Sequence, residues 1–176
     1  MSIYREEIMK ADIYTDGGCY PNNGNGNGAW AFVVLVNNEV IHEDAGYVEG
    51  TTNNRMEMTA IKKALSRAKL SGYTQLVVHS DSMYCINGMT KWRKSWAKKP
   101  NKKILNKDLW NSLWDTEAGL KVRYKHVKGH SGVEWNEYVD GMCSDIMASR
   151  GGEVYDMQDD ELSYLDFRFN DMLTGD

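Results

Sequence analysis

The chain has 176 residues, of which 41% are hydrophobic and 26% are charged, and its formal net charge is −4 at pH 7. This length suits one globular domain with its own core and is short for two. The composition is ordinary for a soluble protein, and no segment has the length and hydrophobicity of a membrane span, which excludes an integral membrane protein.

The first half of the chain predicts three strands, at residues 12–15, 29–36 and 40–47, because β-branched and aromatic residues gather there between turns rich in Asn and Gly. Short turns favour antiparallel pairing. The glycines of residues 22–28 superficially resemble a phosphate-binding loop, but a strand follows them instead of a helix. We interpret this segment as a hairpin connection, with close backbone approach to a ligand as the functional alternative.

The second half alternates helical and strand patterns. The predicted order is helix, strand, helix, helix, strand and helix, at residues 56–70, 75–79, 83–89, 107–117, 120–127 and 134–150. Strands that are separated by helices require parallel, right-handed crossovers. We therefore expect an α/β fold whose mixed sheet begins antiparallel, continues parallel and carries helices on its faces.

Four acidic residues border apolar runs where a core would not favour them: Asp16, Glu57, Asp81 and Asp140. Glu57 lies one turn before Ile61 on an apolar helical stripe, so it should face inward. Asp16 and Asp81 each end a strand-like run, and Asp140 stands at the margin of a third apolar stripe. Converging carboxylates repel one another unless a cation neutralises them, and an all-oxygen cage suits Mg²⁺ or Mn²⁺. The pattern thus predicts a metal site.

Three of the four acids also have an ordinary alternative. Asp81 could cap the helix that follows it, Glu57 could be a first-turn acid favoured by the helix dipole, and Asp16 could be a turn residue before two glycines. The metal site rests on the four together.

Residues 82–107 contain no acid and eight bases, a pattern typical of a surface that binds polyanions. Trp92 and Trp96 lie one helical turn apart among these bases. They could pack in the core, or they could contact sugars and bases while the lysines meet phosphates. Trp110 and Trp114 repeat the spacing, and core packing is the preferred interpretation for them.

The segments TDGG, TTNNRME, SDS, KGHSG and NEYVD, in this order, resemble a bacterial-type type 1 ribonuclease H over residues 10–150. The resemblance implies a five-stranded mixed sheet in the order 3-2-1-4-5, and an endonuclease that cleaves the RNA strand of RNA/DNA hybrids with two Mg²⁺ ions, leaving 5′-phosphate and 3′-hydroxyl ends. The N-terminal segment MSIYREEIMKADIY has no uninterrupted apolar run and carries acids early, which is unlike a secretory signal or transit peptide, so we expect a cytoplasmic protein. We also expect a monomer associated with DNA replication.

The resemblance assigns roles to individual residues. The metal ligands would be Asp16, Glu57, Asp81 and Asp140, and the mobile catalytic histidine would be His130. Contacts to the hybrid would come from Asn22, Thr52, Asn53 and Asn54, and from a basic protrusion formed by Trp92, Arg93, Lys94, Trp96, Lys98 and Lys99. Met83 departs from the family pattern, because a glutamine that reads the RNA minor groove usually stands there.

Two other functions fit parts of the sequence. A non-catalytic binder of hybrids or single strands would not need four intact carboxylates, and another nuclease of the same fold would not need the TTNNRME and basic tryptophan-lysine segments. Both features are present, so ribonuclease H is the preferred hypothesis.

The C-terminal segment, residues 151–176, lies outside the resemblance. It carries eight acids against one base, so the −4 of the whole chain divides into −7 here and +3 for residues 1–150. Acidic runs usually indicate solvated disorder, yet seven apolar residues also stand within residues 162–173. We therefore treat residues 1–150 as the catalytic domain and the tail as a docking segment, either for its own basic body or for a protein partner.

Overall fold

Residues 9–129 and 131–150 are described by a computed structural model, in which five strands and a set of helices form one α/β unit. In chain order the elements are β1 (Lys10–Tyr20), β2 (Gly26–Val36), β3 (Glu39–Thr51), α1 (Asn53–Leu70), β4 (Gln75–Ser80), α2 (Met83–Asn87), the π-helical turn η1 (Gly88–Trp92), α3 (Arg93–Ala97), α4 (Lys107–Glu117), β5 (Lys121–His126) and α5 (Glu134–Ser149). His130 and residues 151–176, on which two of the predictions depend, lie outside the described residues.

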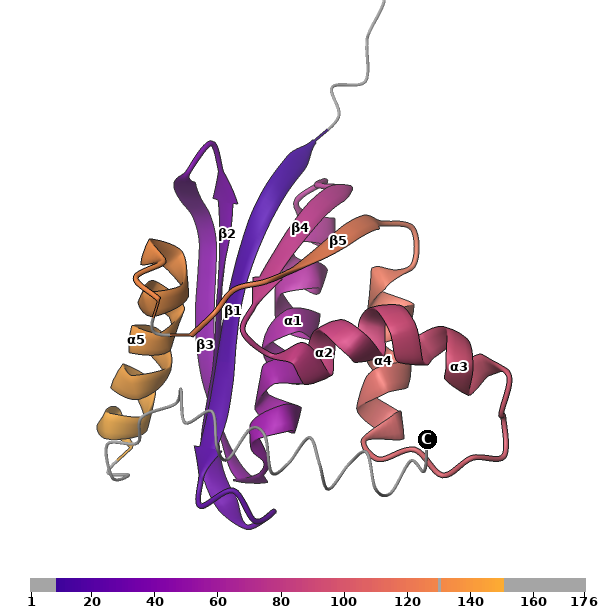
Figure 1. Cartoon of the computed structure of the whole chain (residues 1–176). Coiled ribbons are helices and arrows are strands. Elements are labelled where there is room, and N and C mark those ends of the chain that lie inside the picture. The colour runs from indigo at the N-terminus through magenta and orange to yellow at the C-terminus, as the bar shows by residue number, and fades with distance from the viewer. Residues whose placement is uncertain (1–8, 130, 151–176) are drawn as a thin grey trace, which may run out of the picture.

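The strands form a single mixed sheet in the order β3-β2-β1-β4-β5 (Figure 1). β1 pairs antiparallel with β2, and β2 pairs antiparallel with β3, as their short connections require. β1, β4 and β5 run parallel, because α1 and the later helices carry the chain back between them. This confirms the predicted order and strand directions.

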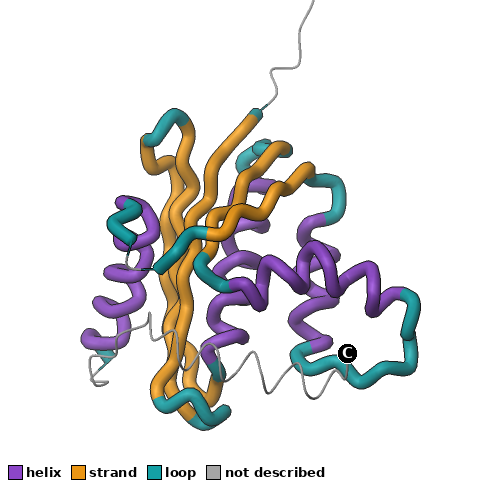
Figure 2. Tube along the Cα trace, in the orientation of Figure 1, coloured by secondary structure: helices purple, strands orange, loops and turns teal. Residues whose placement is uncertain are grey.

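Helices lie on both faces of the sheet (Figures 1 and 2). On one face α1, α2, α3 and α4 enclose the larger core, to which β2 contributes Trp30, Phe32 and Val34. On the other face α5 covers β1, β2 and β3, and alternate residues of β2 such as Ala31 and Val33 fill the smaller core. None of the helices within the described ranges is long and apolar enough to cross a bilayer.

Several elements extend beyond their predicted limits. β1 does not end before Asp16 but continues to Tyr20, because its Gly17–Gly18 stretch pairs with β2. α1 begins at Asn53, three residues earlier than its apolar stripe indicated, since Thr52 caps it by accepting a hydrogen bond from the Arg55 N–H. The basic segment is also helical through Ala97, because η1 and α3 follow α2 without a break.

Candidate active site

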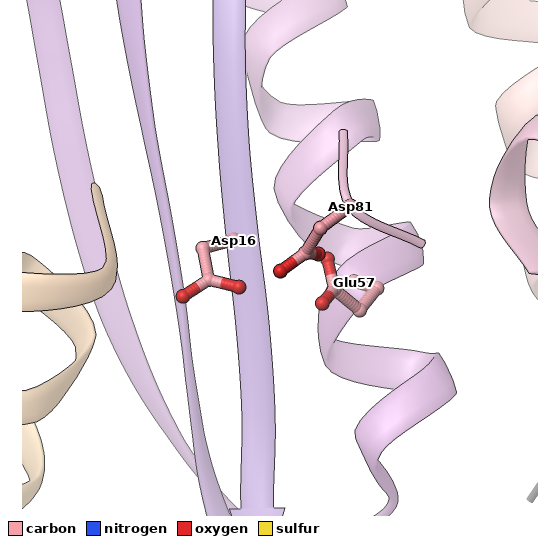
Figure 3. A group of neighbouring side chains, drawn as sticks. All are labelled: Asp16, Glu57 and Asp81. Atoms are coloured by element: carbon pink, nitrogen blue, oxygen red, sulfur yellow. The ribbon is translucent and has the colours of Figure 1, made fainter. Parts of the chain in front are cut away.

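Three of the four predicted carboxylates meet at the centre of the sheet (Figure 3). Asp16 comes from β1, Glu57 from α1 and Asp81 from the turn after β4, and one oxygen from each lies within 4.8 Å of the others. Asp140 of α5 adds a fourth carboxyl beside Asp16, close enough to share a hydrogen bond with it when one of the two is protonated. The structure thus brings together the four acids that the sequence singled out.

The backbone explains how β1 and α1 bring two acids so close. Gly17 faces the first turns of α1, and a Cβ on Gly17 would overlap the backbone of Met56 and Glu57. With no side chain there, α1 lies directly against β1, and Glu57 in its second turn comes within reach of Asp16.

The ordinary alternatives for these acids are wrong. The side chain of Ser82, not that of Asp81, caps α2 by accepting from the Cys85 N–H. Glu57 is the fifth residue of α1 and so lies beyond its first turn, and Asp16 pairs with Ala31 in the middle of a strand. None of the three positions is accounted for by capping or turn formation.

Burial and mutual repulsion set the electrostatics of the cluster. Asp16 is 1% exposed and Glu57 is 5% exposed. Burial raises the pKa of Asp16 well above its ordinary value, and the charges of Asp81 and Asp140 raise it further, while the Gly17 N–H acts weakly in the opposite direction. Burial likewise raises the pKa of Glu57, with added repulsion from Asp81 and Asp16.

The donor set fits a hard divalent cation. Both carboxylate oxygens of Asp16 and Oε2 of Glu57 are buried, and apart from the weak contact of Asp16 with the Gly17 N–H they meet no hydrogen-bond donor among the described residues. Buried carboxylates need a proton, a donor or a cation, and a compact set of carboxylate oxygens is the donor chemistry that Mg²⁺ and Mn²⁺ prefer. These residues can therefore hold a divalent metal.

All four small polar residues predicted to contact nucleic acid lie around the junction of β1 and α1. The Asn53 N–H donates to Oδ1 of Asn22 at 2.9 Å, and the Cys19 N–H donates to Oδ1 of Asn53 at 2.6 Å. Thr52 is half-buried, and its hydroxyl oxygen caps α1 by accepting a hydrogen bond from the Arg55 N–H. Asn54 follows in the first turn of α1 and is 2% exposed, as Asn53 is at 3%. Asn53 and Asn54 are thus largely enclosed, and Asn22 and Thr52 are the more accessible pair.

The basic protrusion, which we define as residues 91–107, is built on a cluster of tryptophans. Trp96 is 4% exposed and packs against Trp110 and Trp114, with ring centroids 5.7 and 6.0 Å away. The Trp96 ring thus lies in the core of this structure, and its predicted contact with nucleic acid stays a prediction. Trp92 is half-buried and packs edge-on against Tyr84.

The cations of the protrusion, like its tryptophans, differ in whether they pack against the fold or face solvent. The Arg93 guanidinium pairs with Glu117 at 3.0 Å, which anchors α3 to the end of α4. Lys94, Lys98 and Lys99 are exposed. These three lysines are the predicted contacts that the structure presents on the surface.

One network near the site was not predicted. The Arg55 guanidinium donates to both carboxylate oxygens of Asp108, at 3.2 and 3.1 Å, and to Oδ1 of Asn106. Asn106, in the left-handed conformation at φ 60°, also donates to the Tyr84 hydroxyl. Arg55 stands inside TTNNRME, but its partners are more than 50 residues away, so no local pattern could reveal them. The network ties the start of α1 to the end of the basic protrusion.

Two further predicted residues are Met83 and His130. Met83 opens α2 with 42% of its surface exposed, two residues after Asp81. His130 lies outside the described residues, in the connection between β5 and α5.

Comparison with known proteins identifies the family. The RNase H family model matches residues 9–148, which is most of the chain and all five strands. The chain belongs to the ribonuclease H family. Ribonuclease H of Cyanothece sp. (strain PCC 7425) is 38% identical over 158 residues, covering 87% of this chain and 98% of that protein. At this coverage the resemblance extends over the whole of the relative.

Solved structures of the family share the fold. The crystal structure of LC9-RNase H1, a type 1 RNase H with the type 2 active-site motif, superposes with a TM-score of 0.71 and 25% identity, covering 81% of this chain and 73% of that one. LC11-RNase H1, solved in complex with an RNA/DNA hybrid, superposes with a TM-score of 0.60 and 20% identity, covering 78% and 99%. Because LC11-RNase H1 is only 20% identical, the comparison with it shows a shared fold and nothing more.

Proposed function

We propose that this ribonuclease H hydrolyses the RNA strand of RNA/DNA hybrids at an internal phosphodiester, leaving a 5′-phosphate and a 3′-hydroxyl. The observation that carries the proposal is the meeting of Asp16, Glu57 and Asp81 within 4.8 Å, in a chain that belongs to the ribonuclease H family. Such a cluster has little use in a binding module, because burying two acids beside a third destabilises the fold unless a cation occupies the site.

We propose Mg²⁺ as the physiological metal, with Mn²⁺ as a substitute, and two ions held by Asp16, Glu57, Asp81 and Asp140. Asp16 interacts with both Asp81 and Asp140, so it would hold the metal together with these two neighbours. Bound divalent ions would activate the attacking water and stabilise the leaving 3′ oxygen. The protein's own task is then to place the scissile phosphate and to hold the carboxylates ionised and in position. His130, in the Gly-flanked loop KGHSG, would move a proton or assist product release, because an imidazole titrates near neutral pH.

Recognition of the hybrid would combine two surfaces. Asn22 and Thr52 lie at the junction of β1 and α1 beside the carboxylates, where amide and hydroxyl groups can read 2′-hydroxyls of the RNA strand. The lysines of the protrusion would bind phosphates of the DNA strand, and Trp92 presents the one partly accessible ring among them in the described chain. A relative of the same fold, LC11-RNase H1, binds an RNA/DNA hybrid in its crystal.

We further propose that the enzyme acts as a monomer in the cytoplasm. The large hydrophobic side chains exposed in the described residues are scattered over β1, β3, α1, α2 and α5, so they offer no continuous apolar patch for a permanent partner. Cys19, Cys85 and Cys143 are buried thiols, which is consistent with a reducing compartment.

One assay tests the proposed function against its alternatives. Strand-specifically labelled RNA/DNA hybrid, duplex RNA and duplex DNA are incubated with the protein in Mg²⁺, in Mn²⁺ and in a chelator. We expect cleavage of the RNA strand of the hybrid alone, and only with metal. Binding without cleavage would show a non-catalytic hybrid-binding protein, and cleavage of duplex DNA would show another nuclease of the same fold.

A further inference from the structure

The sheet formed by the described residues has two edges, β3 and β5, and they differ in charge. β3 carries four acids and no lysine or arginine. β5 has the sequence KVRYKH, and its Lys121, Arg123 and Lys125 are all exposed. Val122 and Tyr124 pack on the larger core, so the three bases project from the opposite face.

The backbone of β5 is open along this edge. The Lys121 N–H donates to Thr74 O and the Val127 N–H donates to Ser80 O, so the odd-numbered residues turn their amides toward β4. The even-numbered residues, Val122, Tyr124 and His126, therefore turn theirs away from the sheet, where a further strand can bond them.

Three features of the β5 edge indicate which kind of strand could pair with it. Lysines and arginines on an edge oppose pairing with a second copy of the same edge, yet they attract an acidic segment. Val122 offers a half-buried apolar side chain on the α4 side. A groove of 820 Å³ lies over the beginnings of β1, β4 and β5, and Leu120, Lys121 and Val122 form its β5 end.

The chain itself contains a segment of this kind. Residues 165–170, LDFRFN, alternate apolar and polar side chains over six positions, the length of β5. The polar side carries one acid and one base, so electrostatic attraction would come from the acids that flank the segment, Asp160, Glu161 and Asp171.

The segment can reach β5. Arg150, the last described residue, lies over the Tyr47 ring of β3, at the far edge of the sheet. Crossing four strand spacings requires about 19 Å, and the strand register adds roughly 10–26 Å along the strands between Tyr47 and β5. Residues 151–164 span at most about 46–50 Å when extended. The nearer edge, β3, is acidic and would repel the tail.

We propose that residues 165–170 add to the edge of β5 as a sixth strand, with Leu165, Phe167 and Phe169 toward the α4 side and the polar residues toward Lys121, Arg123 and Lys125. This docking is independent of the proposed nuclease activity. It gives the tail a site on its own body, at the basic edge of the sheet and apart from the basic protrusion.

Hydrogen exchange at the three edge amides tests the proposal. In the full chain we expect the amides of Val122, Tyr124 and His126 to exchange at least tenfold more slowly than in a chain that ends at Arg150. Phe167→Pro should remove this protection, since proline cannot donate to a ladder and disrupts the alternation. Met172→Pro, outside the six residues, is the matched control and should leave it in place.

Charge reversal distinguishes the two basic surfaces. Lys121→Glu, Arg123→Glu and Lys125→Glu together should remove the protection, whereas Lys94→Glu, Lys98→Glu and Lys99→Glu should not. Equal exchange in the full and shortened chains would overturn the proposal. Protection that falls on dilution would also overturn it, because the occupant would then be the tail of a second copy.

Discussion

Asp16 occupies a position where an uncharged side chain would pack at lower cost. It lies mid-strand, is 1% exposed, and faces Asp81 and Asp140. An ionised carboxylate in such a place weakens the fold unless a cation balances it. The same cluster of negative charge would bind the divalent metal that the reaction at the phosphate requires. Stability and activity should therefore respond in opposite directions when Asp16 loses its charge.

Asp16→Asn should lower the cleavage rate of the hybrid by at least about 10³-fold, because metal-based charge stabilisation contributes several kcal/mol and each ~1.4 kcal/mol is tenfold in rate. Hybrid affinity should remain measurable, since the basic protrusion is untouched. Single-turnover cleavage and equilibrium binding are the two measurements. A cleavage rate near that of the wild type would rule out the assignment of Asp16 as a metal ligand.

The same variant should be more stable than the wild type in a chelator at pH 7. In the metal-free wild type the folded state retains protons on Asp16 and Glu57 that the unfolded chain releases near pH 4, so stability falls as the pH rises toward the raised folded pKa values. Asp16→Asn removes part of this loss, by about 1 kcal/mol or ~4 °C in Tm for a domain of this size. Thermal melts from pH 4 to 8 would show it as a flatter profile.

The wild type and Asp16→Asn should also differ in how much Mg²⁺ stabilises them. Mg²⁺ should raise the Tm of the wild type, and more so at higher pH because the ligands must lose their protons to bind it. It should have little effect on Asp16→Asn. Equal stabilisation of both proteins by Mg²⁺ would place the metal elsewhere.

The four acids could be predicted from sequence because each breaks a local rule of burial. Glu57 interrupts an apolar helical stripe, and Asp16 follows β-branched and aromatic residues in a strand. The Arg55–Asp108 pair and the left-handed Asn106 could not be, since they depend on how α1 and α4 meet across more than 50 residues of chain. Local periodicity carries no information about such contacts.

At the scale of elements, the basic protrusion has one side that packs in the core and one side that faces solvent. Its apolar side is the cluster of Trp92, Trp96, Trp110 and Trp114, and its outer side carries the lysines. The one-turn spacing of Trp92 and Trp96 is compatible with a helix, although none was predicted for this segment, and it does not indicate which tryptophan faces solvent. That depends on α4, whose Trp110 is fully buried beneath α2 and η1.

Gly88 tests how tightly this core is packed. A Cβ at Gly88 would overlap the Trp110 ring, so Gly88→Ala should destabilise the protein by about 1–3 kcal/mol despite the better helix propensity of alanine. Gly141 in α5 has no atom within 4 Å of the corresponding position. As the matched control, Gly141→Ala should stabilise by about 0.5–1 kcal/mol. Urea denaturation measures both, and a stabilising Gly88→Ala would contradict the packing described here.

Replacement of the exposed lysines tests whether the outer side of the protrusion binds the hybrid. Replacing Lys94, Lys98 and Lys99 by Ala should weaken hybrid binding and reduce the slope of log K against log salt by roughly 0.9 for each phosphate that the protein no longer neutralises. The matched control replaces three other exposed bases, Lys10, Lys63 and Arg67, in β1 and α1. If both triple variants change the slope equally, the protrusion has no special part in binding.

At the scale of the whole molecule, charge is divided between two parts of the chain. Residues 1–150 carry +3 and residues 151–176 carry −7, so the tail reverses the sign of the whole protein. A polyanionic substrate approaches the field of the entire chain before it meets any side chain. Wherever the tail docks, its acids should therefore oppose binding of the hybrid at long range.

Deleting residues 151–176 should tighten hybrid binding at low ionic strength by roughly tenfold or more, because steering by net charge is strong when the Debye length is about 30 Å and weak when it is about 8 Å. The difference should vanish at physiological salt, and single-turnover cleavage of bound hybrid should be unchanged. A full-length variant in which the eight acids of the tail become Asn or Gln should reproduce the deletion, whereas Phe167→Ser with Phe169→Ser should not. If affinity is the same with and without the tail across the salt series, the acids exert no field on the substrate, and docking of the tail then has no consequence for nucleic-acid binding.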